Sequence, residues 1–494
     1  MNKIHSKVWN RALNQLVVVS ELATSNPGGS AHGAVRHRSR HRLSAGLLLG
    51  LAALGGSAWV LPAHAQTVDC SGAPYNAYNS TASCMGLSSA ASGIGATALG
   101  SLAHADVLGG LAVGYNSHSA GQNSVSLGFQ ALSTAINSIY IGARTGSAGA
   151  TAGGAIAMGT DVTATGGNSI AIGTSAAAST TNAMALGPGS SVDANSVNSI
   201  AVGYQTAVVN SNNALALGSG STITGGTHAT AVGWQALATN LNAVYLGART
   251  VGVGAAGQGA VAIGTDVSVA GDQGIGMGLQ ANASQANATA IGRQAAATGA
   301  AALALGGNAT AGAAASGNNA IAVGGQSTAT QANAIAVGLQ SNSAGTNAVA
   351  LGTLAAATQA SAVAVGLQAS AGAANAVAMG GAANASGAQG VALGYGTSAG
   401  AANAFAAGNA SKALAASTVA FGDSNTVAAA SGTGSIAAGH NSQVKGGTGA
   451  VALGEGQVVT GNGAVAIGDP NITNGNGAVT MGANNVAAGD AAGT

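Results

Sequence analysis

The sequence predicts an all-β chain that forms a parallel β-roll solenoid with coils of about 14 residues, and three observations support this. The first is a tandem repeat, a four-residue Ala-apolar-Ala-apolar phrase closed by glycine, such as Ala-Val-Ala-Leu-Gly at 348–352. From Gly100 to Gly482 there are 27 closing glycines, and 18 of the 26 intervals between them are 14 residues long. A period this short, sustained over most of a chain, is typical of a solenoid.

The second observation is an alternation of large and small side chains before each closing glycine. Position −1 is Leu, Ile, Val, Met or Phe in 25 of 27 repeats, position −2 is alanine in 22, and position −3 is almost always apolar. A period of two indicates a β-strand rather than a helix. We expect the −1 and −3 side chains to form a thin core. The −2 alanines would then form a flat apolar stripe that serves as a subunit interface.

The third observation is the composition, with 82 glycines, 5 prolines, 47% hydrophobic residues and 5% charged residues. Glycine does not recur at every third position, which excludes collagen. High hydrophobic content with low charge is the opposite of the composition of disordered chains.

Residues 1–65 are predicted to be an extended signal peptide. They carry seven basic residues and one acidic residue, and the uncharged apolar run 44–61 follows the arginines of 36–42. Because the run ends in Ala63-His64-Ala65, residues 36–65 are typical of a secretory signal cleaved between Ala65 and Gln66. The alternative is a transmembrane anchor, since the run approaches the length of a short span.

A further segment, 1–23, precedes this signal. Its Met1-Asn2-Lys3-Ile4 start, its Trp9-Asn10 pair and its Val-Val-Val-Ser-Glu-Leu-Ala end at 17–23 resemble the extended signal region of large Gram-negative autotransporters. The resemblance implies that this segment slows or tunes export across the inner membrane.

Residues 66–90 contain both cysteines of the chain, Cys70 and Cys84. In an oxidising periplasm such a pair is expected to form a disulfide, which stabilises the fold by about 3 kcal/mol in the chain-entropy estimate. The alternatives are two free thiols or a metal site, although two cysteines without further ligands suit zinc poorly. We expect the closed loop to cap the first coil of the solenoid.

Residues 91–482 hold the repeats themselves. Position −5 is asparagine in 13 repeats and glycine in eight, and these two residues share a tolerance of positive φ. Each strand is therefore expected to begin after a turn at −5 and to end in a turn at the glycine, with asparagines able to hydrogen-bond from coil to coil. A second short strand follows, as in 367–372, with alanines facing the core. Stacked about 4.8 Å apart, 26 intervals give a rod of about 125 Å.

Repeats of the form Asn-x-Ala-Ile-Ala-Ile-Gly resemble the YadA-like heads of trimeric autotransporter adhesins, over about residues 90–482. The resemblance implies a left-handed parallel β-roll, a homotrimer, and display at the outer membrane. It also implies attachment to host matrix proteins, cell-surface receptors or other bacterial cells.

Residues 483–494 are expected to be a truncated end. They show no neck, no coiled-coil heptads and no amphipathic strands of a membrane barrel. The full-length family is associated with the outer membrane, and a chain without an anchor would be secreted.

Two arginines are the candidate ligand contacts. Arg144 and Arg249 lie in long intervals, at equivalent places of a block that recurs with an offset of 105 residues. The alternatives are a salt link to an aspartate or a solvated loop position. Tyr140 and Tyr245 replace alanine at −2 just before these loops, where trimer-interface packing is favoured over ligand stacking.

No catalytic, metal or cofactor site is predicted, and the protein is not expected to be an enzyme. The histidines His104, His118, His228 and His440 lack metal-ligand spacing and no acidic cluster accompanies them. Residues 66–494 carry five basic and ten acidic residues, so nucleic acid is excluded as a partner. The predicted function is a surface adhesin head. The alternative is a structural rod for autoaggregation or biofilm that has no defined receptor.

Overall fold

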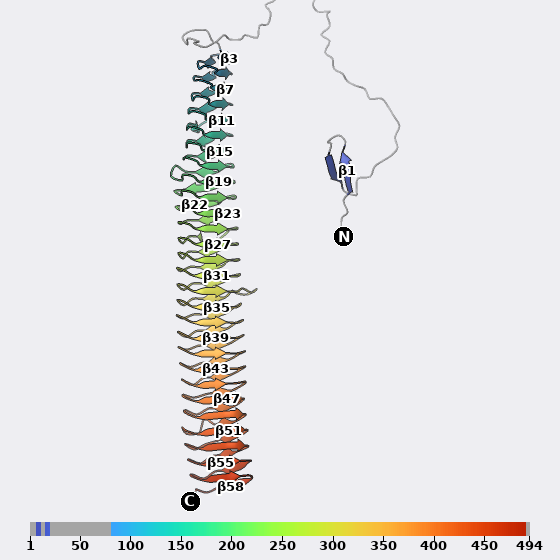
Figure 1. Cartoon of the computed structure of the whole chain (residues 1–494), viewed down its shortest axis with the longest axis vertical. Helices are drawn as coiled ribbons and strands as arrows, with labels where there is room; N and C mark the ends of the chain where they lie inside the picture. The colour runs from blue at the N-terminus through green and yellow to red at the C-terminus, as the bar shows by residue number, and fades with distance from the viewer. Residues whose placement is uncertain (1–5, 11–14, 20–80, 491–494) are drawn as a thin grey trace, which may run out of the picture. The chain divides into compact units, whose positions relative to one another are not determined.

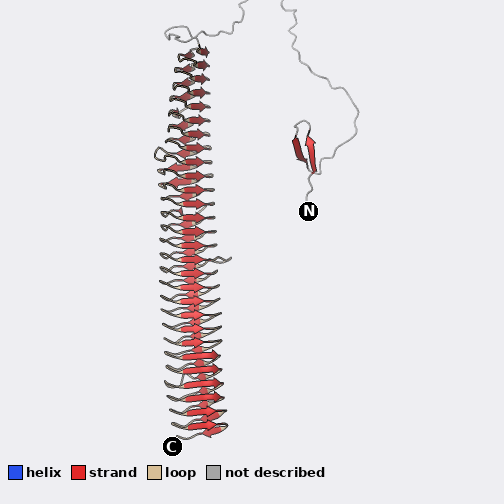
Figure 2. Cartoon of the chain, in the orientation of Figure 1, coloured by secondary structure: helices blue, strands red, loops and turns tan. Residues whose placement is uncertain are grey.

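The computed structural model describes residues 6–10, 15–19 and 81–490, which fall in two separate units, 1–64 and 65–494. In the first unit, β1 (Ser6–Asn10) and β2 (Gln15–Val19) pair antiparallel. In the second unit, short parallel strands are stacked one coil upon another (Figure 1). The described residues form strands and turns without a helix (Figure 2), so none of them belongs to an apolar helix that could span a membrane.

Each coil contributes one strand to each of two parallel sheets. Strands with odd numbers, β3 to β57, occupy positions −3 to −1 before a closing glycine, as β5 (Thr97–Leu99) does. Strands with even numbers, β4 to β58, lie four and five residues after it, as β6 (His104–Ala105) does. Each strand that is not at an end of the solenoid pairs in parallel with the equivalent strands of the coils before and after it. Leu111, for example, pairs with Thr97 on one side and with Val125 on the other. The predicted all-β parallel solenoid is confirmed.

Some strands depart from these bounds. The strands that are shifted because an interval is longer are β12 (Gly149–Ala150), β26 (Gly254–Ala255) and β34 (Ala314–Ala315). The extended strands are β20 (Ala207–Val209), β22 (Thr222–Thr224), β47 (Phe405–Asn409), β49 (Val419–Asp423), β51 (Ile436–His440), β53 (Val451–Glu455), β55 (Val465–Gly468), β56 (Asn471–Thr473), β57 (Val479–Gly482) and β58 (Asn485–Ala487). Because β3 (Ser83–Met85) and β58 lie outside 91–482, the solenoid is longer than the repeats predicted.

The interior of a coil is filled by alanines rather than by the large apolar residues. In the coil around Gly366, Ala362, Ala364, Ala369 and Ala371 are all 0% exposed, whereas Val363 and Val365 point outward and are half-buried. The predicted period of two and the inward alanines of the second strand are confirmed. The prediction that −1 and −3 form the core and that −2 forms the outer stripe is wrong. A coil of two short strands has a narrow interior that is filled mainly by small side chains, so the larger −1 and −3 side chains lie on the outer face.

The volume of this interior is adjusted locally. Gly276 replaces alanine at −2, and a Cβ built on it would lie 2.7 Å from a γ-carbon of Val267 and of Val269. Both valines are fully buried. Val269 occupies a place where most coils have alanine, and Val267 occupies one where alanine and serine predominate. A larger side chain on one strand is therefore matched by a smaller one on the facing strand, as close packing requires.

The predicted turns are confirmed at position −5. All 13 asparagines there have φ between 53° and 59°, and the eight glycines have φ between 61° and 73°. Asparagines in neighbouring coils bond to each other, as where Asn333 Nδ2 donates to Asn347 Oδ1 at 2.9 Å. A second left-handed turn, which was not predicted from the sequence, lies two residues after most closing glycines, as at Gln368 (φ 57°).

The closing glycines are sterically required. Their φ values run from 104° at Gly482 to 139° at Gly247, a region that residues with a side chain rarely adopt. A Cβ on Gly366 would lie 2.5 Å from the carbonyl oxygen of Gly380, the closing glycine of the next coil. The glycines thus form a column in which the backbones of successive coils touch.

Candidate interaction surfaces

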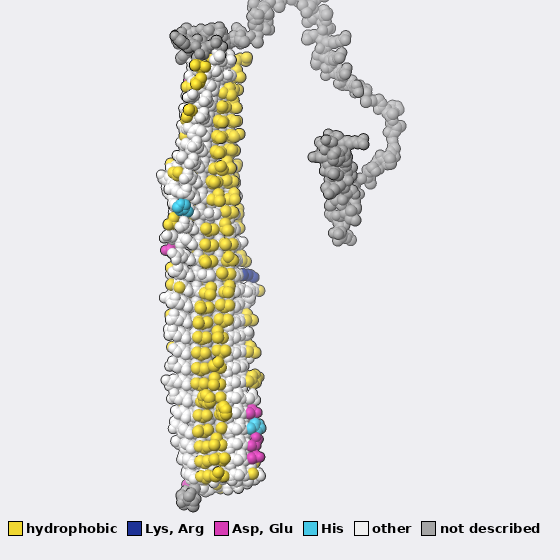
Figure 3. All heavy atoms as spheres, viewed as in Figure 1, with side chains coloured by type: hydrophobic (Ala, Val, Ile, Leu, Met, Phe, Trp, Pro, Cys, Tyr) yellow, Lys and Arg dark blue, Asp and Glu magenta, His cyan; other side chains and the backbone are white. Residues whose placement is uncertain are grey.

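Large apolar side chains run along one face of the solenoid. We name the −3 and −1 side chains of the coils that close at Gly100 to Gly482 the apolar stripe. Many of them are more than a third exposed, such as Ile172 (39%), Leu305 (40%) and Met379 (44%). In Figure 3 they form columns of hydrophobic side chains along the stack. An apolar surface this extensive is typical of a protein interface.

The two candidate arginines fix the loops that carry them. Arg144 donates from Nε to the Gln130 carbonyl oxygen at 2.8 Å and from Nη1 to the Ser147 carbonyl oxygen at 2.9 Å. Arg249 makes the same bonds to Gln235 (2.9 Å) and Gly252 (3.2 Å). The guanidinium groups bind backbone oxygens of the preceding coil and of their own loop. They form no salt link within 4.0 Å among the described residues.

An aspartate from the following coil holds the other side of each loop. Asp161 accepts hydrogen bonds from the backbone and hydroxyl of Thr145 and from the backbone N–H of Gly146. Asp266 accepts the equivalent bonds from Thr250 and Val251. These donors hold the pKa of both carboxyl groups below the ordinary value, with Thr145 N–H the largest cause at Asp161 and Val251 N–H at Asp266. Each loop is therefore clamped between its two neighbouring coils.

Tyr140 and Tyr245 lie inside the solenoid. Both are 0% exposed, and each donates its hydroxyl at 3.0 Å to a loop carbonyl oxygen, that of Ala143 or Ala248. Burial is the main cause that raises the pKa of Tyr245. The prediction that these rings pack at a trimer interface is wrong, because position −2 faces inward. The longer intervals that follow them widen the coil enough to accept a ring.

Five other aromatic residues share an outward position that was not singled out from the sequence. They directly follow a closing glycine and are each about half exposed or more: Tyr115 (49%), Phe129 (46%), Tyr204 (56%), Trp234 (47%) and Tyr395 (70%). Tyr115 and Phe129 stack with centroids 5.6 Å apart. The signal was available in the sequence, since the position relative to the glycine is constant.

Histidines pair with carboxylates at two places. His118 Nε2 lies 2.6 Å from Asp106 Oδ2, and this hydrogen bond is the largest cause of the lowered pKa of Asp106. His440 lies 2.6 Å from a Glu455 carboxylate oxygen and 3.7 Å from Asp423 Oδ2. Across the described part of the chain, no three His, Cys, Asp or Glu side chains are grouped so that they could hold a metal ion.

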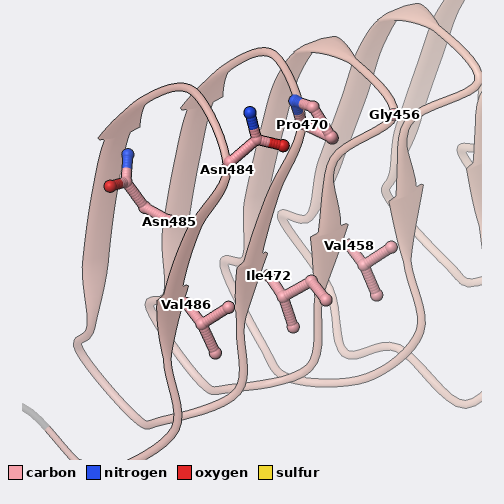
Figure 4. Close-up of a pocket in the computed structure, with 7 residues that line it drawn as sticks. All are labelled: Gly456, Val458, Pro470, Ile472, Asn484, Asn485 and Val486. Carbon is pink, nitrogen blue, oxygen red and sulfur yellow. The ribbon is translucent and has the colours of Figure 1, made fainter.

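A depression of about 360 Å³ lies over the last coils (Figure 4). Val458, Ile472 and Val486 line one side, and Pro470 and Asn484 line the other. Its lining contains no titratable side chain, so it offers apolar contacts and amide hydrogen bonds rather than acid–base chemistry.

Three of the predicted site residues, Ala65, Gln66 and Cys70, lie outside the described residues. Cys84 lies in β3 and is partly buried against the first alanines of the solenoid. The cleavage site and the disulfide therefore stay predictions.

Comparison with known families identifies two segments. Residues 1–50 match the extended signal peptide of the type V secretion system. The YadA head domain repeat, a model of two copies, matches residues 91–117, 119–145, 164–190, 225–250, 270–295, 315–341, 343–369, 371–397 and 430–456. No curated protein matches the chain.

Heads built from these repeats form homotrimers and are structural adhesins rather than enzymes. The outward stripe of this chain is the kind of surface that such an assembly would cover. Because the extended signal peptide and the YadA head repeat together are characteristic of one class of exported protein, the chain belongs to the trimeric autotransporter adhesins.

Proposed function

We propose that this protein is the surface-exposed head of an adhesin that attaches bacteria to host cells or to extracellular matrix. The observation that carries the proposal is a long solenoid with an apolar stripe, together with exposed rings and loops at other positions of the repeat. The stripe accounts for assembly, and the remaining surface is free for attachment. Three parallel copies would present every surface feature three times, which raises the avidity of weak contacts.

The proposed homotrimer buries the apolar stripe of each chain. Light scattering of the purified chain is expected to give three times the mass of one protomer. The double substitution Val363→Asp/Val377→Asp places two charges in the proposed interface and is expected to abolish the trimer. Both side chains face outward and are only half-buried in the single chain, so the coils themselves should tolerate the change. A stable trimer in this variant would contradict the proposed interface.

Attachment can be tested directly with the purified trimer. We expect it to bind matrix-coated plates or host cells in a saturable manner. The second candidate, an autoaggregation rod, is favoured by the low charge of residues 66–494, which offers little repulsion between copies. Binding of the trimer to itself alone would favour the rod and contradict the host adhesin.

Export and capping are further proposals. We expect cleavage after Ala65, which N-terminal sequencing of the exported chain would check, followed by display at the outer membrane. We also expect Cys70 and Cys84 to pair, so that non-reducing peptide mapping finds one linked peptide. Surface display can be measured by antibody labelling of intact cells.

A further inference from the structure

The duplicated block places the same arrangement on the surface twice. Phe129 and Trp234 occupy equivalent positions, directly after the closing glycines Gly128 and Gly233, and about half of each side chain is exposed. Each ring is followed by a glutamine in the left-handed turn, Gln130 (φ 51°) or Gln235 (φ 49°). A partly exposed aromatic ring is therefore followed directly by a residue whose carboxamide can both donate and accept hydrogen bonds. Phe129 stacks on Tyr115 with one face, so its other face is the one available to a ligand.

The loop of the next coil is tied to each ring in the same way. The backbone N–H of Arg144 donates to the Phe129 carbonyl oxygen at 2.9 Å, and that of Arg249 donates to the Trp234 carbonyl oxygen at 2.9 Å. The Nε atoms of the two arginines also donate to the backbone carbonyl oxygens of Gln130 and Gln235. Because Asp161 and Asp266 hold the loop tips, both loops are ordered before any ligand arrives. Preorganisation of this kind reduces the entropic cost of binding.

The charge of the arrangement indicates an uncharged ligand. Each copy contains one arginine and one aspartate, whose opposite charges offset each other, and both groups already bond within the loop. The surrounding side chains are hydroxyls, amides and apolar groups. An anionic or cationic ligand would therefore meet no unpaired opposite charge here.

Two common modes of polypeptide recognition do not fit. A peptide strand could not be added to the sheet here, because β9 (Val125–Leu127) and β23 (Thr230–Val232) are paired on both sides. Proline-rich peptides bind in grooves lined by several aromatic residues. Phe129 and Trp234 lie seven coils apart and do not line one groove.

We propose that these two arrangements, Phe129-Gln130 and Trp234-Gln235 with their clamped loops, are equivalent sites for a neutral saccharide of a host glycan. The inference rests on the proposed adhesin function and names its ligand class. A pyranose has one face of weakly polarised C–H bonds that stacks on the electron-rich face of an aromatic ring. Its equatorial hydroxyls could then form hydrogen bonds with the glutamine carboxamide. A ligand without hydroxyls at these positions would bind less tightly.

The spacing of the two sites suits an extended glycan layer. They are separated by seven coils, or about 34 Å at 4.8 Å per coil. A homotrimer would carry six such sites. Weak binding at each site would therefore add up on a surface that presents many copies of the sugar.

The full chain, as the purified trimer, would be tested on arrays of neutral, sialylated and sulfated glycans. We expect binding to a subset of the neutral glycans that does not weaken when the salt concentration is raised. The double variant Phe129→Ala/Trp234→Ala is expected to lose at least tenfold in affinity, and each single variant is expected to lose less. Gln130→Gly/Gln235→Gly, which keeps the positive φ but removes the carboxamide, is expected to weaken binding too.

Tyr395→Ala is the matched control. This ring is also exposed and also follows a closing glycine, but Gly396 replaces the glutamine and no clamped loop follows. Its removal should leave glycan binding unchanged. Equal loss in Tyr395→Ala, or loss of the trimer rather than of binding in the double variant, would overturn the assignment.

The saccharide sites and the adhesin function fail in different ways. A trimer that binds host cells or matrix but no neutral glycan would overturn the saccharide sites and leave the adhesin standing. A trimer that binds neither cells, matrix nor glycans would overturn the adhesin itself.

Discussion

The coils from Gly324 to Gly422 and the coils after Gly142 and Gly247 are built from the same repeat, but they use it differently. In the first region every interval is 14 residues, and the −2 side chain is always a buried alanine. In the second, the interval is 17 residues, a buried tyrosine replaces that alanine, and an arginine and an aspartate hold the extra residues.

The difference shows how a regular solenoid accepts irregularity. The added residues do not disturb the ladder of the first sheet, because β11 (Ile139–Ile141) and β13 (Ile156–Met158) pair in the usual register across the insertion. In the second sheet one residue pair is lost, since β12 pairs with the preceding coil only through Ser133 and Ala150. The coil widens on the second sheet instead, where Tyr140 fills the space and bonds to the loop. The first sheet thus keeps its regular pairing, and the second sheet accommodates the extra residues.

The largest expected effect is a substitution that breaks the regular region. Gly366→Ala places a Cβ 2.5 Å from the Gly380 carbonyl oxygen at a φ of 133°. We expect a loss of about 4 kcal/mol in the free energy of unfolding, from backbone strain and steric overlap together. Urea titration followed by circular dichroism would measure it.

Gly463→Asn is the control for this substitution. Gly463 also has a positive φ (61°), but no heavy atom lies within 4 Å of the place that a Cβ would occupy, and 13 other repeats have asparagine at this position. The change should be within about 0.5 kcal/mol. Similar losses in both variants would contradict the glycine-column interpretation.

The next effect concerns the widened coils. Tyr245→Ala is expected to cost about 3 kcal/mol, because it leaves a cavity and removes the hydrogen bond to Ala248. The reciprocal change in the regular region, Ala364→Tyr, should also destabilise, since no longer interval makes room there. A neutral Ala364→Tyr, measured by the same urea titration, would show that the regular coil is wider than its alanines indicate.

The loop clamp should depend on pH. The folded-state pKa of Asp266 is lowered by its loop donors, so the stabilisation is present above the unfolded pKa of about 3.9 and is lost as pH falls through the folded value. The protection of the Thr250 and Val251 amides, measured as hydrogen exchange relative to the intrinsic rate at the same pH, should therefore be high at neutral pH and should fall in acid.

Asp266→Asn is expected to accelerate exchange of these amides at neutral pH, because the amide is a weaker acceptor than the carboxylate. Exchange at Thr145 and Gly146, which Asp161 holds, should not change in this variant. Loss of protection in both loops would mean that the two copies are coupled rather than independent.

The smallest effect is expected at a turn. Asn333→Ala should cost about 1 kcal/mol, because alanine tolerates a φ of 58° less well and cannot bond to Asn347. Asn333→Gly relieves the backbone term and should recover most of the loss. A larger loss in the glycine variant would indicate that the asparagine ladder dominates over backbone preference.

Most of the fold could be predicted because the repeat is a strong signal. The period, the strands, the turns at −5 and the asparagine ladder follow from patterns that recur in coil after coil. The prediction assigned the inner and outer faces of the strand the wrong way round, because large apolar side chains usually lie inside a protein. Nothing in an alternating pattern says which set lies inside. The width of the coil decides it, and that depends on how close the two sheets lie.

The surface was less predictable. Arg144 and Arg249 were identified as unusual, but their hydrogen bonds to the carbonyl oxygens of Gln130 and Gln235 depend on contacts between coils that a linear pattern does not contain. The exposed position of Phe129 and Trp234 could have been found by aligning the repeats at their closing glycines.

The column of touching glycines has a consequence for how such a head changes over generations. Every coil contacts the next one through the same backbone surface. A block of whole coils can therefore be duplicated or deleted, and the coils at the new junction still fit each other. A single substitution in the column, by contrast, disturbs two neighbouring coils at once. The 105-residue duplication, seven coils with its rings and loops intact, is what this asymmetry favours. The number of coils can therefore change readily in this protein, whereas the closing glycines cannot be substituted without disturbing the stack.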